Sequence, residues 1–209
     1  MQIAIDGPAG VGKTTIGWEL AKKCGFLFLE SGRLYRAAAY TRLKDLQLEH
    51  MGIEITRDNR ARITVENSPL GEDLQSEEIG EKASQLAREK SVRRFVTHLI
   101  RDFSDDREMV IEGRDIGTVV LPEADLKIYL TAAARERARR RQKQLGQEDQ
   151  SSLTKVTRAI QKRDNRDKNR SDAPLKPAED AIIIDTTSLS RRETLKKVVH
   201  LVDKHKNCP

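Results

Sequence analysis

The stretch GPAGVGKTT at residues 7–15 is the part of the sequence with the clearest chemistry, because it combines three glycines with a lysine and two threonines. Its spacing, Gly7-x-x-x-x-Gly12-Lys13-Thr14, matches the phosphate-binding loop, or P-loop. Glycines let the backbone curl so that successive N–H groups point at phosphate oxygens. Lys13 brings a positive charge to the outer phosphates, and the Thr14 hydroxyl is suited to ligate Mg²⁺. The stretch therefore predicts a binding site for a nucleoside triphosphate, and we expect ATP.

The residues on either side of this loop fit the same interpretation. The apolar run before it predicts a buried strand, and residues 13–25 predict a helix whose positive end faces the bound phosphates. Gly25 is a typical helix stop. We expect Lys13 to be catalytic, Thr14 to be the metal ligand, and the nucleotide to contact the whole loop: Gly7, Pro8, Ala9, Gly10, Val11, Gly12, Lys13, Thr14 and Thr15.

Strands and helices are predicted to alternate along the rest of the chain. Four further strands are expected at residues 26–30, 108–112, 125–131 and 181–185. The segments between and after them have helical periodicity: 32–46, 91–103, 134–146, 152–170 and a final helix that opens with Ser190 and Glu193 at capping-box spacing. This order predicts an α/β fold with a five-stranded parallel sheet flanked by helices, built as one domain over residues 1–209.

Two segments interrupt this alternation. Residues 53–80 contain short β-like runs and predict a small β-rich insert. The polar sequence GQEDQSS at 146–152 predicts a loop or flap between two helices.

The composition indicates an anionic partner. The 209 residues carry a formal net charge of +6, with 34% charged and only 4% aromatic residues. Nucleic acid is one such partner, but the sequence has no zinc-ligand spacing and no interleaving of basic and aromatic residues. A small, highly charged substrate is the other, and we expect that class. The chain shows no apolar run long enough for a membrane span and no signal peptide, so we expect a cytoplasmic protein without membrane or nucleic-acid partners.

Arginines recur at helical spacing in two places. The sequence KRDNRDKNR puts Arg163, Arg166, Asp167 and Arg170 on one predicted helical face. From spacing alone, a phosphate-binding face and a solvent face with salt bridges are equally good interpretations. A second cluster at residues 137, 140 and 141 is more typical of plain surface.

A P-loop does not by itself distinguish a switch, a motor and a kinase. No asparagine begins the Asn-Lys-x-Asp sequence that a GTPase uses to read guanine. Helicases and transporter ATPases are normally larger. A small kinase is therefore the favoured class, and a nucleic-acid-binding protein with a vestigial P-loop is the alternative, which salt-sensitive binding without turnover would reveal.

Five blocks in fixed order then resemble the bacterial cytidylate kinase family. They are IDGPAGVGKTT, ESGRLYRAAA, ASQLA…VR, IEGRDIGTVVLPEADLKIYLTA and KRDNRDKNRSDAPLKPAEDAIIIDTT. The resemblance runs essentially from Ile3 to Thr187. The GRD-x-GT and R-D-x-R-D-x-N-R blocks are much more specific than the P-loop. Adenylate and shikimate kinases remain the alternative enzymes, to be separated by a panel of substrates.

The resemblance implies a nucleoside monophosphate kinase fold, with a monophosphate-binding insert at about 53–90 and a short lid at about 142–155. The implied reaction transfers the γ-phosphoryl group of ATP, bound with Mg²⁺, to CMP or dCMP. The implied partners are small-molecule nucleotides, and we expect a monomer.

The resemblance also assigns the acceptor site residue by residue. Matched positions in the family grip the acceptor phosphate (Arg36, Arg114, Arg170), read cytosine (Ser84, Arg93, Asp115), contact the sugar (Arg163, Asp167) or line the acceptor pocket (Ser31). Arg114, Arg163 and Arg170 join Lys13 as the implied catalytic residues. Glu30 stands where the family usually has Asp. These assignments agree with the chemistry, because an acceptor that is already an anion needs charge stabilisation and positioning, which arginine supplies, and no strong general base.

Overall fold

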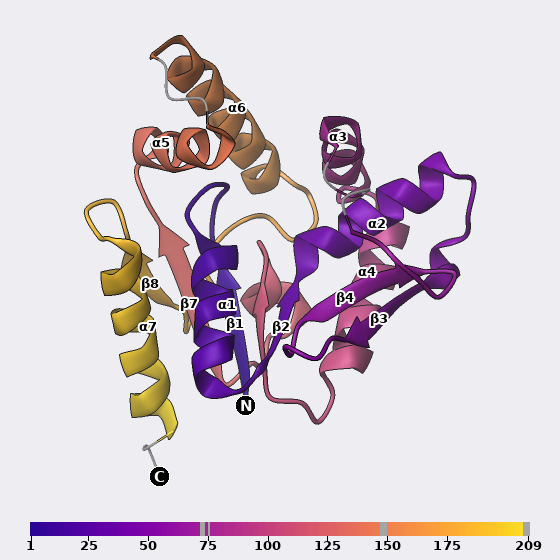
Figure 1. Ribbon diagram of the computed structural model, residues 1–209, viewed down its shortest axis with the longest axis horizontal. Coiled ribbons are helices and arrows are strands. Elements are labelled where there is room, and N and C mark those ends of the chain that lie inside the picture. The colour runs from indigo at the N-terminus through magenta and orange to yellow at the C-terminus, as the bar shows by residue number, and fades with distance from the viewer. Residues whose placement is uncertain (72–73, 75, 147–149, 207–209) are drawn as a thin grey trace.

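The computed structural model describes residues 1–71, 74, 76–146 and 150–206, and its centre is a five-stranded sheet (Figure 1). The strand order is β2-β6-β1-β7-β8, and every neighbouring pair is parallel. The strands are β1 (Gln2–Asp6), β2 (Leu27–Glu30), β6 (Met109–Glu112), β7 (Leu126–Thr131) and β8 (Ile182–Asp185). All five coincide with the predicted strands to within a residue or two, so the sheet predicted from the sequence is confirmed.

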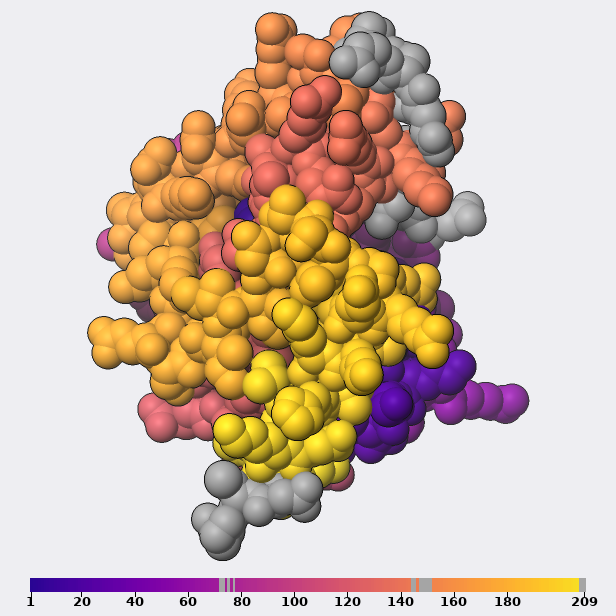
Figure 2. Space-filling model, turned by 90° about the vertical axis from the view of Figure 1, so that its left-hand side faces the viewer, coloured from indigo at the N-terminus to yellow at the C-terminus, as the bar shows by residue number. Residues whose placement is uncertain are grey.

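Helices cover both faces of this sheet. Ile3 and Ile5 pack with α1 (Lys13–Cys24) and α7 (Arg191–Lys206), whereas Ala4, between them, packs with the opposite layer. That layer is formed chiefly by α2 (Ser31–Leu43) and α4 (Lys90–Ser104). Side chains of successive strand residues point to opposite faces, so a strand buried on both sides reads as a continuous apolar run. Figure 2 shows α7 in the foreground, with α5 and α6 at the upper end of the molecule.

Two predicted helix boundaries are confirmed by their capping bonds. Gly25 adopts a left-handed conformation after α1, with φ of 74°, and its N–H donates to the Ala21 carbonyl. Before α7, the Ser190 N–H donates to Glu193 Oε2 at 2.8 Å, and the Glu193 N–H donates to Ser190 Oγ at 3.2 Å. These reciprocal bonds form the expected capping box.

The β-rich segment is an antiparallel sheet of three strands that lies beside the main sheet. In the chain, this segment follows a 3₁₀ turn at Leu48–His50. Its strands are β3 (Met51–Ile55), β4 (Ala61–Val65) and β5 (Ser68–Pro69), so it begins two residues before the predicted boundary. The helix α3 (Glu77–Leu86) follows it and was not predicted. Its buried Ile79, Ala83 and Leu86 lie at helical spacing, and that pattern was the available signal.

The predicted loop at 146–152 is shorter than expected. Helix α5 (Ala134–Leu145) ends at Gly146, which is left-handed with φ of 64°, and α6 (Gln150–Lys168) starts at residue 150. Residues 150–152 are therefore helical, which makes that part of the prediction wrong, and residues 147–149 lie outside the described residues. Both helices pack on the P-loop through a small cluster: Ala9, Ala138, Leu153 and Ile160.

A single π-helical turn, η3 (Ile116–Val120), follows β6 and was also not predicted. π-helical turns are rare and occur often at functional sites. Across the described ranges, no helix combines the length and the apolar character of a membrane span.

Candidate active site

The P-loop connects β1 to α1, as the sequence predicts. Gly7, Gly10 and Gly12 all have positive φ, at 149°, 73° and 100°. At Gly7 a side chain is excluded outright, because a Cβ there would lie 2.2 Å from the carbonyl oxygen of Leu130. The loop backbone is thus set by glycine, with the first turn of α1 directly behind it.

Lys13 is buried at the base of this loop. Its Nζ donates to the Pro8 carbonyl at 3.1 Å and lies 3.7 Å from Glu112 Oε2. Burial, and then the nearby charge of Arg114, lowers the pKa of Lys13 to about 7. A bound triphosphate would reverse this effect, since negative charge favours the protonated amine.

Glu112 is a residue of the site that the sequence reasoning missed. It ends β6, next to the strand that carries the P-loop, and the Thr14 hydroxyl donates to its Oε1 at 3.4 Å. A hydroxyl and a carboxylate oxygen are the hard ligands that Mg²⁺ prefers, so Thr14 and Glu112 fit a magnesium ion held near the triphosphate. The sequence feature that could have indicated Glu112 is its position at the carboxyl end of a predicted strand.

A buried ion pair braces the outer side of the loop. Asp164 on α6 accepts from the Ala9 N–H at 3.0 Å and from Arg137 Nη1 at 2.6 Å. Arg137 also donates to the Ala9 carbonyl at 2.7 Å. The interpretation of Arg137 as plain surface is therefore wrong, because this side chain fastens α5 and α6 to the P-loop.

Asp167 gathers two of the three predicted catalytic arginines. Its carboxylate accepts from Arg114 Nε at 3.0 Å and, through the other oxygen, from Arg170 Nη2. The Asp167 side chain is only 2% exposed, so it fixes both guanidinium groups in place. Arg163, four residues earlier on α6, is exposed to solvent. Desolvation of the guanidinium by neighbouring protein atoms, and then the positive charge of Arg114, lower the pKa of Arg163 to about 10. Arg163 is therefore protonated at neutral pH.

The three predicted base-reading residues lie around the α3–α4 connection and the start of η3. Arg93 is buried and donates to Asp115 Oδ2, to the Tyr35 hydroxyl at 3.4 Å and to the Ala87 carbonyl at 3.4 Å. The Ser84 hydroxyl, one turn before Ala87, is buried and has no hydrogen-bond partner among the described residues. A buried hydroxyl without a partner is costly, so the Ser84 hydroxyl is suited to bond a polar ligand.

The remaining predicted acceptor residues are held by other parts of the chain. Arg36 Nη1 donates to the carbonyls of Leu74 at 2.6 Å and Ser76 at 3.3 Å, so it is tied to the segment between β5 and α3. Ser31 is buried at the first turn of α2, and its Oγ lies 2.6 Å from where a Cβ on Gly113 would be. Ser31 thus lies against the GRD turn. Burial, and then the carboxylate of Glu112, raises the pKa of Glu30 to about 7.

A model of the cytidylate kinase family matches residues 3–204, nearly the whole chain. The chain belongs to the cytidylate kinase family. Curated relatives agree: a cytidylate kinase from Thermotoga maritima is 44% identical over 99% of this chain and 98% of its own, and one from Pseudomonas fluorescens is 43% identical over 94% and 93%. The resemblance seen in the sequence is confirmed.

Solved structures with lower identity support the fold of this cytidylate kinase family member. A gluconokinase from Sinorhizobium meliloti aligns with a TM-score of 0.53 and 14% identity, over 99% of this chain and 94% of that chain. A shikimate kinase from Bacteroides thetaiotaomicron aligns with a TM-score of 0.51 and 15% identity, over 100% and 99%. At such identities the likeness shows the fold alone.

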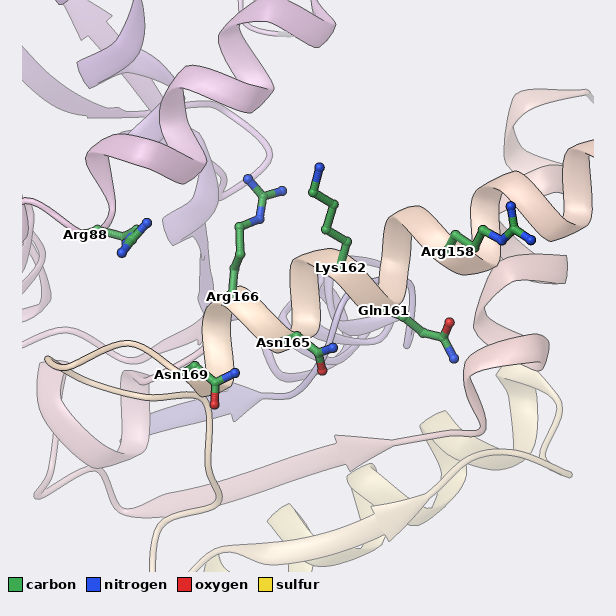
Figure 3. A pocket seen from close by; sticks show the side chains of 7 residues that line it. All are labelled: Arg88, Arg158, Gln161, Lys162, Asn165, Arg166 and Asn169. Atoms are coloured by element: carbon green, nitrogen blue, oxygen red, sulfur yellow. The ribbon is translucent and has the colours of Figure 1, made fainter.

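The predicted single helical face does not hold in full. Arg170 lies beyond the end of α6 and reaches Asp167 from the following segment. Arg166 instead lines a cavity of about 550 Å³ that extends from α6 to Arg88 in the turn after α3. Figure 3 shows Arg166 and Lys162 pointing the same way from α6, with Arg88 extending from the turn between α3 and α4. The other lining residues are Arg158, Gln161, Asn165 and Asn169.

Proposed function

We propose that the protein transfers the γ-phosphoryl group of ATP to CMP or dCMP, giving ADP and CDP or dCDP. The observation that carries this proposal is the meeting of two arginines on buried Asp167, close enough to the P-loop for Arg114 to depress the pKa of Lys13. Family membership supports the kinase activity and the cytidylate acceptor.

On the donor side, Lys13 and the loop N–H groups bind the triphosphate, while Thr14 and Glu112 would hold Mg²⁺, which would supply neutralisation of charge on the phosphates. Because Lys13 is buried, its interaction with phosphate oxygens is poorly screened and therefore strong.

On the acceptor side, Arg36, Arg114 and Arg170 grip the monophosphate. Asp167 fixes two of these guanidinium planes before the substrate arrives, which is the preorganisation that stabilises charge in a transition state. Arg163 is charged, is reached by solvent and lies close to Arg114, so it can contact both the sugar and the transferring group. No general base is needed, because the acceptor oxygen is already anionic at neutral pH.

CMP is expected to be phosphorylated at least about tenfold more efficiently than UMP, as measured by ADP release with each monophosphate at saturating ATP. Asp115 accepts from the exocyclic amino group of cytosine but meets the uracil carbonyl oxygen to oxygen. Such a mismatch costs about 1–3 kcal/mol, and about 1.4 kcal/mol corresponds to a factor of ten. dCMP should behave like CMP, and AMP and GMP should hardly react.

Asp115→Ala provides the control for this selectivity. The substitution should lower kcat/KM for CMP, because the attraction for cytosine is lost. It should also bring the CMP/UMP ratio of kcat/KM closer to one, because the repulsion against uracil is lost at the same time. Equal kcat/KM values for the two substrates in the wild type would contradict the base-reading role.

We also propose that the segments at about 53–90 and 142–155 close over the bound substrates. Arg36, an acceptor residue on α2, is bonded to the first segment through Leu74 and Ser76, so substrate binding at this arginine should draw the segment inward. Amide hydrogen exchange in both segments should slow in the presence of a bisubstrate analogue compared with the free protein. Exchange rates that stay the same in both segments would show that they do not close.

We propose that the protein acts as a monomer in the cytoplasm on small nucleotides and without nucleic acid, because the proposed substrate site gives an anionic partner to the cluster of Arg36, Arg114, Arg163 and Arg170. Sedimentation at working concentration tests the monomer.

A further inference from the structure

Asp6 is a buried carboxylate for which the proposed mechanism has no use. It is the last residue of β1, directly before Gly7 of the P-loop, and it is 5% exposed. Its two oxygens accept separate backbone bonds, from the Ile116 N–H at 2.9 Å and from the Gly117 N–H at 2.8 Å. Within the described ranges, the Asp6 carboxylate has no side-chain hydrogen-bond partner.

The two donors are the first residues of the π-helical turn η3. Ile116 and Gly117 are both buried, and N–H groups at the start of a helix lack partners within it. Asp6 therefore caps η3 from a position 110 residues away in the chain. Without the carboxylate, two buried donors would be left unpaired, which is the costly outcome for backbone groups.

Asp115, which immediately precedes this capped turn, belongs to the acceptor site. Its carbonyl accepts from the N–H groups of Val119 at 2.9 Å and Val120 at 3.1 Å, and its side chain pairs with Arg93. The backbone of Asp115 is thus held on one side by the turn itself and on the other by the cap. Arg114 lies one residue before Asp115, so the same cap also helps to fix the backbone of an arginine that binds the acceptor phosphate in the proposed function.

We propose that Asp6 is a positioning residue for the acceptor site: by capping η3 it fixes Arg114 and Asp115 relative to the P-loop, and thereby sets both the affinity for CMP and the preference for cytosine. This inference rests on the proposed function, specifically on the base-reading role of Asp115. It makes the junction of β1 and the P-loop a link between the donor and acceptor sites.

The cap that Asp6 forms depends on whether its carboxyl group is ionised, and this makes the proposed positioning role dependent on pH. Burial raises the pKa of Asp6 to about 6, the bonds from Gly117 and Ile116 oppose that rise, and of the neighbouring charges Asp115 raises the pKa and Lys13 lowers it. Tyr129 on β7 also lies close enough for Asp6 to raise the pKa of its hydroxyl. Ionised Asp6 accepts both N–H bonds, whereas the protonated acid presents an O–H toward one of these donors.

Positioning and stability therefore respond to pH in opposite directions. The pKa of Asp6 in the folded state exceeds the ordinary value of 3.8, so its ionisation disfavours the fold as pH rises from about 4 to 6. The cap, by contrast, needs the ionised form. As pH falls through 6, protonation of Asp6 should lower the CMP/UMP ratio of kcat/KM. Over the same range the contribution of Asp6 to the free energy of unfolding should become more favourable. A residue with a purely structural role would not show these two changes together.

The test compares Asp6→Asn with a matched variant, Asp164→Asn. Both residues are buried aspartates, each 5% exposed, that accept backbone N–H bonds, but Asp164 braces Ala9 in the P-loop. Asp6→Asn should raise KM for CMP about tenfold and shrink the CMP/UMP ratio of kcat/KM, with the dissociation constant for ATP within about twofold of wild type. Asp164→Asn should weaken ATP binding and leave that ratio intact.

A second readout uses the wild-type protein, so it does not depend on whether a variant folds. The CMP/UMP ratio, measured from pH 8 to 5.5, should fall with a midpoint near 6, because the two substrates share the titrating phosphate and differ only in the base. A ratio that is constant across this range, or a folded Asp6→Asn protein with unchanged KM and ratio, would overturn the proposal. A wild type with no preference for CMP at pH 8 would instead refute the role of Asp115.

Discussion

Replacing Lys13 with alanine will lower kcat by about 10³-fold or more, because the variant loses the buried cation that meets the charge developing on the transferring phosphoryl group. The effect is expected to be large since Lys13 is 5% exposed and acts where water screens little. ADP release at saturating ATP and CMP measures it.

The same substitution should leave the free energy of unfolding unchanged or higher. Burial lowers the pKa of Lys13 to about 7, so the protonated amine disfavours the fold at every pH below its unfolded value near 10.5. Urea unfolding at pH 7 tests this point. Lys13→Arg is the matched control: it keeps the charge but brings a wide planar group into a loop built for a compact one, so activity should also be largely lost. An alanine variant that turns over at the wild-type rate would exclude Lys13 from the site.

The elements that the sequence predicts well are those with a local cause. The strand before the P-loop, α1 with its stop at Gly25, and the capping box of Ser190 and Glu193 all depend on residues a few positions apart. The same holds for the β-rich segment, whose alternation and turn residues are local signals. Tertiary packing then adds to preferences that the chain already has.

Helix α3 was missed although its helical spacing is a local signal, but other missed features depend on contacts between distant positions. The turn η3 is capped by Asp6, and the residues next to η3 in the sequence do not predict that cap. Arg137 reads as one more exposed cation until α5 is folded back on the P-loop, where Ala9 and Asp164 surround it. Helical spacing could place Arg163 and Asp167 on one face, but it could not show that the helix ends before Arg170. The identities of these residues were visible in the sequence, and their environments were not.

The same distinction applies within the candidate site. The P-loop residues follow from their spacing, because the geometry of the loop is local. The predicted acceptor arginines come from α2, the GRD turn and the segment after α6, so only the family resemblance could bring them together in advance. The structure adds the means of assembly, which is the carboxylate of Asp167 between Arg114 and Arg170.

Replacing Arg170 with methionine should lower kcat/KM for CMP by about 10²- to 10³-fold, the range typical for the loss of one preorganised donor. Arg170 and Arg114 share Asp167, so each single substitution leaves the carboxylate paired with the other arginine. For that reason the fold should survive either change, with a stability loss of about 1–3 kcal/mol for the partly unpaired group.

Arg114→Met should have a similar kinetic effect, and the double variant should lose less than the product of the two single effects, because residues that act through one shared partner are not additive. Arg170→Lys serves as the control, since lysine keeps the charge without the planar fork and should recover only part of the rate. If Arg170→Met loses stability but retains its rate, the interpretation of these residues as a salt-bridged surface, which the spacing alone left open, is the correct one. If the rate falls and the fold stays intact, Asp167 holds the arginines for the acceptor phosphate.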